Sequence, residues 1–192
     1  MPWCATRLSQ ISPEGLRSRC WAALAIASAL AALPAHAQLF RPDYEQILNE
    51  RDWQENAIGL PVFPQSDRLV EFYVSASTSF RFFIDPHSLT VGDDGVVRYV
   101  LVARSSSGVD NVWFEGIRCK SAELKRYATG RSDGTWAARR GAQWAAIDPR
   151  TMNRQHQALQ REYFCPHNLP IATAAEGIDA LRRGGHPNAK GQ

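Results

Sequence analysis

Apolar and polar positions alternate along much of the chain, which is the pattern of β-strands that bury one face. The alternation is clearest in residues 96–104 (VVRYVLVAR), where Val97, Tyr99, Leu101 and Ala103 share one apolar face and Arg98 and Arg104 lie on the other beside valines. Residues 111–119 (NVWFEGIRC) alternate too: Val112, Phe114, Gly116 and Arg118 share one face, and Trp113, Glu115, Ile117 and Cys119 the other. With the turns at 92–95 and 105–110, the stretch 85–119 predicts three consecutive antiparallel strands.

Further strands are predicted on both sides of this stretch. Residues 69–74 (LVEFYV) and 80–84 (FRFFI) form a plausible hairpin across a polar turn. Residues 123–129 favour an edge strand, and Trp136 and Trp144 flank a last, irregular hairpin. Residues 60–64 (LPVFP) contain two prolines and should run extended over the sheet, with Leu60 and Phe63 as anchors.

Helical spacing appears twice. After Pro42-Asp43, the positions of Tyr44, Ile47, Leu48 and Arg51 predict a short helix, and the clearest helices are predicted near the C-terminus. Asp148-Pro149 matches the start preferences of a helix, and Met152, His156, Leu159 and Tyr163 follow as one stripe before Pro166 ends it. Thr173 and Glu176 form a capping box for a second helix, which ends at Gly184-Gly185. Strands first and helices last predict an α+β fold, with an antiparallel sheet of about five to seven strands and C-terminal helices packed on one face.

The N-terminal 37 residues have the layout of a secretory signal peptide. Arg7, Arg17 and Arg19 precede an apolar run at 21–33, which Pro34 ends, and Ala35-His36-Ala37 offers a cleavage site after Ala37. The run is short for a membrane span, so no transmembrane segment is expected after cleavage. We therefore expect a periplasmic protein (or a secreted one) with a single domain over residues 38–185 and a disordered tail over 186–192.

Charge and cysteine content indicate which partners and which covalent links to expect. Residues 38–192 carry 19 basic and 18 acidic side chains, a balance that gives no reason to expect nucleic acid as a partner. Only Cys119 and Cys165 remain after the leader, and in an oxidising compartment they predict one disulfide.

No spacing of residues predicts catalysis, and no cofactor or metal is expected. His156, Cys165 and His167 are irregularly spaced for a metal site, and Cys165 is better used in the disulfide. Asp93-Asp94 is explained by a turn rather than by calcium, and Asp85, His87 and Ser88 are too close in sequence for a triad.

Two groups of residues are candidates for binding. Arg98, Glu115 and Arg118 are polar groups on otherwise apolar strands, and they form either a structural charge network or a site. The four tryptophans of residues 38–192, with Arg139-Arg140, could form a ligand surface, of which Trp136 and Trp144 are the preferred pair; the alternative is plain core packing.

The run SLTVGDDGVVRYVLVARSSSGVDNVWFEGIRC, followed by YATG and later by FCP, resembles the CNP-one-like family of exported bacterial proteins. The resemblance extends from Trp53 to about Arg183. It implies export and a shared fold, and it assigns no reaction and no functional residue.

Taken together, these features favour a non-catalytic periplasmic protein that binds another envelope protein. One alternative is a small envelope hydrolase that uses Glu115. Another is a small-ligand carrier, which would need a pocket above the sheet.

Overall fold

The computed structural model describes residues 52–148, 150 and 154–189, which all lie in one compact unit, residues 43–192. The predicted signal peptide, its cleavage site after Ala37, the predicted short helix at residues 44–51 and the predicted start of the helix at Pro149 lie outside the described residues.

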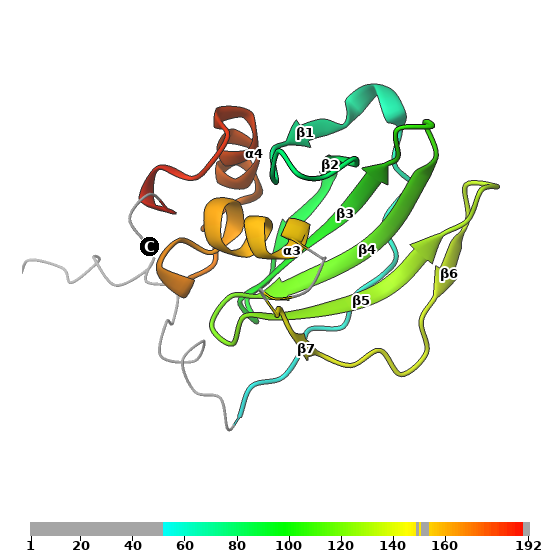
Figure 1. Ribbon diagram of the computed structural model, residues 1–192. Coiled ribbons are helices and arrows are strands. Elements are labelled where there is room, and N and C mark those ends of the chain that lie inside the picture. The colour runs from blue at the N-terminus through cyan, green and yellow to red at the C-terminus, as the bar shows by residue number, and fades with distance from the viewer. Residues whose placement is uncertain (1–51, 149, 151–153, 190–192) are drawn as a thin grey trace, which may run out of the picture. The chain divides into compact units, whose positions relative to one another are not determined.

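A seven-stranded antiparallel sheet forms the centre of this unit, in the order β1-β2-β3-β4-β5-β6, with β7 also paired to β5 (Figure 1). Its strands are β1 (Val70–Phe72), β2 (Arg81–Val91), β3 (Val96–Arg104), β4 (Asp110–Arg118), β5 (Glu123–Gly130), β6 (Trp136–Ala138) and β7 (Ala145–Ala146). The predicted hairpin of β1 with β2 and the three consecutive strands of residues 85–119 are confirmed.

The sheet differs from the prediction in two places. Residues 81–91 form one long strand, β2, whose pairing with β3 is interrupted by a bulge between Asp85 and Thr90. The segments β6 and β7 do not pair as a hairpin; both pair with β5, at opposite ends of that strand. Neither difference changes the α+β fold class, which is confirmed.

Helical segments follow the sheet in the chain, as predicted. They are α3 (Arg154–Ala158), η2 (Leu159–Phe164), η3 (Pro166–Asn168), α4 (Ala174–Arg183) and η4 (Pro187–Ala189), while a short η1 (Ser66–Arg68) precedes β1. The predicted capping box is present, because Thr173 Oγ1 accepts a hydrogen bond from the backbone N–H of Glu176. Helix α4 ends at Gly184, whose positive φ of 72° is a left-handed cap.

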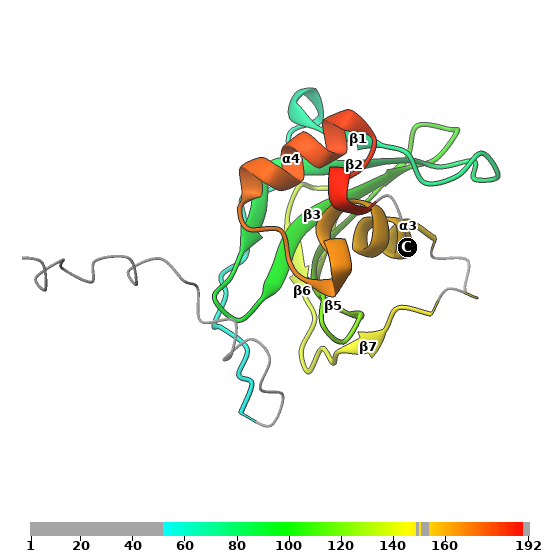
Figure 2. The same ribbon diagram turned by 90° about the vertical axis from the view of Figure 1, so that its left-hand side faces the viewer.

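The two helices α3 and α4 cover one face of the sheet (Figures 1 and 2). His156, Leu159 and Tyr163 are buried toward it, as their spacing predicts, and the main core joins the helices to Val97, Tyr99, Leu101 and Ala103 of β3. The predicted disulfide is confirmed: Cys119 and Cys165, with Cα atoms 5.3 Å apart, join the end of β4 to the end of η2.

The opposite face of the sheet is also covered. A second apolar cluster there contains Val100, Val102 and Phe114, and Phe63 of the extended N-terminal segment packs against it. Phe63 is thus an anchor, as expected, but Leu60 is 48% exposed and is not. Because both faces are covered, all of β3 except Arg104 is buried.

The C-terminal end is more ordered than the sequence predicts. His186 is buried and its ring hydrogen-bonds to Glu176 of α4, and η4 follows it. The structure therefore differs from the predicted tail for residues 186–189, because a buried imidazole with a carboxylate partner holds them to the helix; residues 190–192 lie outside the described part.

Candidate functional site

The structure separates the three charged residues that the sequence grouped together. Arg98 and Arg118 lie on the face covered by the N-terminal segment, whereas Glu115 lies on the face covered by the helices. Arg98 pairs instead with Asp94 in the turn before β3, and both side chains are almost fully buried. The expected network of Arg98, Glu115 and Arg118 does not exist, since odd and even positions of a strand point to opposite faces.

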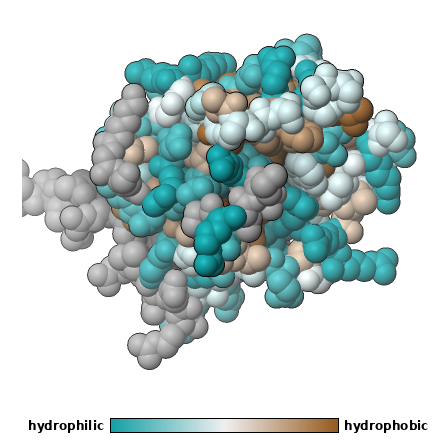
Figure 3. Space-filling model, viewed as in Figure 1, coloured by the Kyte–Doolittle hydropathy of each residue, from teal (hydrophilic) through white to brown (hydrophobic). Residues whose placement is uncertain are grey.

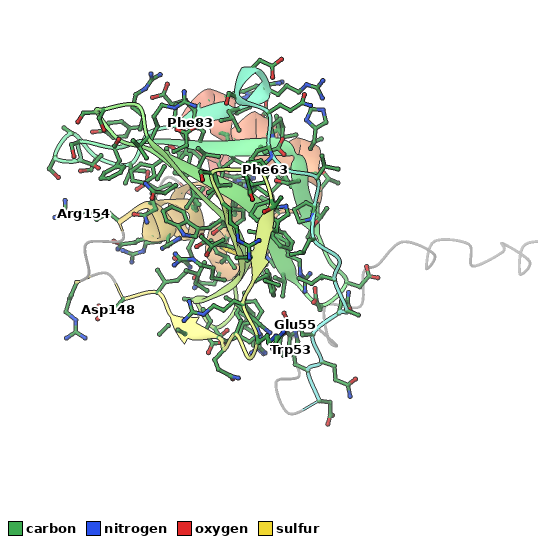
Figure 4. All side chains as sticks on the ribbon, turned by 90° about the vertical axis from the view of Figure 1, so that its right-hand side faces the viewer. Trp53, Glu55, Phe63, Phe83, Asp148 and Arg154 are labelled. Atoms are coloured by element: carbon green, nitrogen blue, oxygen red, sulfur yellow. A yellow bond between two sulfur atoms is a disulfide. The ribbon has the colours of Figure 1, made fainter. Side chains whose placement is uncertain are left out.

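The segment 52–63 occupies the surface on which Arg118, Trp136 and Trp144 were expected to bind a partner. The guanidinium of Arg118 lies 4.0 Å from the ring centre of Trp53. The indole N–H of Trp136 donates to the Pro61 carbonyl, and that of Trp144 lies 3.4 Å from a carboxylate oxygen of Glu55. In Figure 4, Trp53, Glu55 and Phe63 lie along this segment on one side of the sheet, with Asp148 and Arg154 on the other. These contacts are internal packing.

Glu115 is the centre of a different cluster. Its carboxylate is fully buried; one oxygen accepts a hydrogen bond from Nε of Arg126 at 2.8 Å, and the other lies 2.8 Å from Nε2 of His156. Arg126 comes from β5, where it pairs directly with Glu115 of β4, and His156 comes from α3. Three elements thus bring together a carboxylate and two cationic or titratable side chains.

The electrostatics of this cluster favour an ionised Glu115. Burial raises the pKa of its carboxyl group, but the adjacent His156 and Arg126 lower that pKa by more, so it lies below the ordinary value of 4.5. Burial likewise raises the pKa of neighbouring Tyr99, and the charge of Glu115 adds to that rise. At neutral pH Glu115 is therefore a carboxylate held by two donors.

A cleft of about 440 Å³ opens beside the cluster, and we call it the Arg126 cleft. Its lining residues come from β5, the β6–β7 region and α3: Leu124, Arg126, Arg139, Gly141, Ala142, Gln143, Ala145, Ala146, Ile147, Asp148 and His156. The volume is within the range of small-molecule sites, roughly 300–1,000 Å³. Apolar groups therefore meet two arginines and a histidine in one concave surface.

Arg126 has hydrogen-bonding capacity to spare in this cleft. Its Nε is used on Glu115, and its guanidinium stacks 4.9 Å from the ring centre of Trp113. No described residue accepts a hydrogen bond from its two terminal amino groups, and the side chain is 29% exposed. A guanidinium that is oriented by a buried carboxylate and stacked on an indole presents its terminal amino groups in a defined direction.

Sequence reasoning missed Arg126 and assigned His156 to the core alone. His156 is indeed buried, but it also lines the cleft. The available signal was a carboxylate on an apolar strand, which requires a partner; the sequence could not show which cation supplies it, because a register shift between Phe114 and Glu115 sets the pairing with β5.

Much of the distinctive motif at 91–119 has a structural explanation. A Cβ on Gly92 would clash with a carboxylate oxygen of Asp94, and a Cβ on Gly116 would lie 2.8 Å from the Tyr127 hydroxyl. Gly92 leaves room for the Asp94–Arg98 pair, and Gly116 for Tyr127. Glu115 and Trp113 lie on the helix side of the sheet, together with apolar core residues of the same stretch such as Tyr99 and Ile117.

Neither a metal-binding cluster nor a membrane-spanning helix occurs among the described residues. Among residues 52–148, 150 and 154–189, no three His, Cys, Asp or Glu side chains are grouped closely enough to hold a metal ion. Within the same part of the chain, no helix has both the length and the apolar character needed to cross a membrane.

A seven-stranded antiparallel sheet covered by C-terminal helices, with a buried carboxylate beneath a cleft, defines the class of protein as an α+β domain with a candidate ligand site. Comparison with known proteins places the chain more narrowly: it belongs to the CNP1-like family, whose model matches residues 48–182. A relative from Neisseria gonorrhoeae (strain ATCC 700825 / FA 1090), called Cryptic neisserial protein 1, is 28% identical over 140 residues, which cover 64% of this chain and 68% of that protein. No solved structure shows a significant match.

Proposed function

We propose that this protein is an exported, non-catalytic binding protein of the cell envelope, and that the Arg126 cleft recognises a carboxylate presented by another envelope protein. The observation that supports it is that Arg126 lines the cleft and that its two terminal amino groups have no hydrogen-bond partner in the described part of the chain. A guanidinium fork of this kind matches the two oxygens of a carboxylate.

The charge around the cleft supports an anionic ligand. Arg126 and Arg139 line it, and the negative charge of Glu115 is fully buried beneath it between Arg126 and His156. Asp148 at the edge is paired with Arg150, so its charge is partly offset. The apolar side chains of Leu124 and Ile147 provide the remaining wall, which suits the aliphatic part of an acidic residue.

Export is supported by the N-terminal pattern of a basic leader, an apolar run and a small-residue cleavage site, and by the pairing of Cys119 with Cys165. The intact mass of the protein purified from a periplasmic fraction should correspond to a chain that begins at Gln38. A mass that includes residues 1–37 would contradict the proposed cleavage.

The hydrolase alternative has less support from the geometry. A general acid must be protonated before it acts, whereas Glu115 has a lowered pKa and both its oxygens are engaged. No serine, threonine or cysteine occurs among the described residues that line the cleft. The small-ligand carrier would also bind a carboxylate at Arg126. The titration with free carboxylates described below distinguishes it from a protein partner.

The test combines crosslinking with charge reversal. A photoreactive residue at Ala142, which lines the cleft, should form a protein adduct in living cells, and one at exposed Val109 in the β3–β4 turn should not. Arg139→Glu should reduce the Ala142 adduct at least about tenfold, because one cation is replaced by an anion within the site. Arg140→Glu is the matched control, since Arg140 is exposed and does not line the cleft, and it should leave the adduct unchanged.

Purified protein distinguishes a protein carboxylate from a free one. Titration with N-acetyl-aspartate or succinate, followed by NMR of the Arg126 Nε–H signal, should show weak saturable binding that Arg139→Glu diminishes. Shifts from succinate together with no adduct in cells would favour a small-ligand carrier. No adduct and no shift would refute the proposal.

A further inference from the structure

A second cavity, the Trp113 cavity, lies on the helix side of the sheet and has a volume of about 680 Å³. The turn between β1 and β2, the strands β2 to β4 and the first residues of α3 enclose it, and its lining includes Val74, Phe80, Phe82, Trp113, Arg154 and Gln155. Figure 3 shows a mostly hydrophilic surface on the side of the molecule drawn in Figure 1, with only scattered hydrophobic patches. The walls of the Trp113 cavity are mixed: Val74, Phe80, Phe82, Ala103 and Trp113 are the less polar residues, and Ser77, Thr78, Ser79, Asn111, Arg154 and Gln155 are the polar ones.

Trp113 differs from the other described tryptophans in its hydrogen bonding. The indole N–H groups of Trp53, Trp136 and Trp144 each have an acceptor. That of Trp113 has none among the described residues, although the side chain is partly buried and lines the cavity. Its Nε1 is not among the fully buried atoms that lack a partner, so the N–H is open to solvent and can donate to an acceptor on a ligand.

Gln155 provides a second and independent observation. The residue is only 8% exposed and it lines the cavity, yet its side-chain amide makes no hydrogen bond to any described residue. Its amide atoms are not among the fully buried side-chain atoms that lack a partner, so they are open to solvent and a ligand in the cavity can reach them. The amide offers both a donor and an acceptor, which is what a peptide group requires.

We propose that the Trp113 cavity is a second binding site, which takes a large apolar side chain of a peptide and bonds the adjacent uncharged peptide group through Trp113 Nε1–H and the Gln155 amide. Phe80, Phe82 and Val74 supply the apolar walls for the side chain. No acidic residue lines the cavity, and Arg154 at its edge donates to the Ser77 hydroxyl, so the uncharged Trp113 N–H and Gln155 amide are the groups offered to the peptide group.

The two sites are adjacent. Arg126 stacks on Trp113, and the consecutive residues Gln155 and His156 line the Trp113 cavity and the Arg126 cleft respectively. One partner could therefore place an acidic group in the cleft and an apolar residue in the cavity. The inference about the cavity does not depend on the cleft, because the groups that carry it are different.

The probe for the cavity is N-acetyl-L-phenylalaninamide, added to the full mature protein and followed by NMR. We expect saturable shifts of the Trp113 indole N–H, assigned through Trp113→Phe, and of the Gln155 side-chain amide. Gln155→Met and Trp113→Phe should each weaken binding by about fivefold, as expected for the loss of one hydrogen bond. Gln157→Met is the matched control on the same helix, because Gln157 does not line the cavity, and it should change nothing.

Several outcomes would overturn the proposal. They are the absence of shifts at the highest soluble concentration, shifts that survive both substitutions, and stronger shifts from methyl glucoside, which would indicate a carbohydrate site. The carboxylate probes of the Arg126 cleft are titrated separately. Failure of one site is therefore distinguishable from failure of the other.

Discussion

At the scale of single residues, Glu115 combines complete burial with two charged or titratable hydrogen-bond partners. A buried carboxylate of this kind is costly to desolvate, and it is tolerated because Arg126 and His156 satisfy both oxygens. Glu115 does not line the cleft itself. It orients Arg126 and His156, which do. It is thus a positioning residue in the proposed function.

Glu115→Gln should destabilise the protein by about 3 kcal/mol. The substitution removes the negative charge that pairs with Arg126, and it places the NH₂ group of a buried glutamine amide where one carboxylate oxygen accepted a hydrogen bond. Urea unfolding at pH 7 measures this loss. The control is Glu71→Gln, which breaks the exposed pair of Glu71 with Arg81 and should cost less than about 1 kcal/mol. Equal, small losses in both variants would show that the buried cluster is not structural.

At the scale of elements, the end of η2 is attached to the sheet at one covalent point. The Cys119–Cys165 bond links β4 to the residue that follows η2, and Phe164 next to it packs on Tyr99 of β3. The same helical unit carries His156 and Gln155, so its attachment to the sheet also fixes one wall of each cavity. The disulfide therefore supports the sites from a distance.

Replacing both cysteines with serine should lower the free energy of unfolding by about 4 kcal/mol, since the bond closes a loop of 47 residues in the unfolded chain. Urea denaturation measures the change. Reductant supplies the control: dithiothreitol should lower the stability of the natural protein to that of the variant and leave the variant unaffected. Unchanged stability on reduction would contradict a structural bond.

At the scale of the whole domain, the sheet is a central layer with a cover on each side. Helices α3 and α4 supply one cover and residues 52–63 the other (Figure 2). Buried ion pairs occur under both covers, with Asp94–Arg98 on one side and Glu115–Arg126 on the other. The stability of the domain should consequently depend on the ionisation of its carboxylates.

Stability should be greatest near neutral pH and should fall as the pH drops below about 4.5. The pKa values of Glu71, Asp94, Asp110, Glu115 and Glu176 are all lowered in the folded state. As the pH falls, these carboxylates take up protons in the unfolded chain at a higher pH than in the folded protein, because their pKa values are lower in the folded state. The stability that their ionised forms provide is therefore present above the unfolded-state pKa and is lost as the pH falls through the folded-state pKa. Urea midpoints at pH 7, 5, 4 and 3 test this, and midpoints that stay constant down to pH 3 would refute it.

The sequence by itself determined the strands, their faces and the disulfide. Alternation over residues 96–104 and 111–119 assigned the residues to the two faces correctly, because side chains in a strand point alternately to the two faces; that both faces are buried was not evident from it. The helix stripe through His156, Leu159 and Tyr163 followed from the same logic at helical spacing. Local periodicity is therefore predictive of the folded structure, since it determines which side chains of a strand or helix can be buried together.

Only the tertiary structure decided what each polar residue contacts. Arg98 forms an ion pair with Asp94, and Arg118 packs against the ring of Trp53. Glu115 contacts Arg126, 11 residues away in the chain, and His156, 41 residues away. A β-bulge sets the pairing between β4 and β5, and the packing of α3 sets the position of His156. The two cavities arise between elements that are distant in the chain, and no local pattern encodes the space between them.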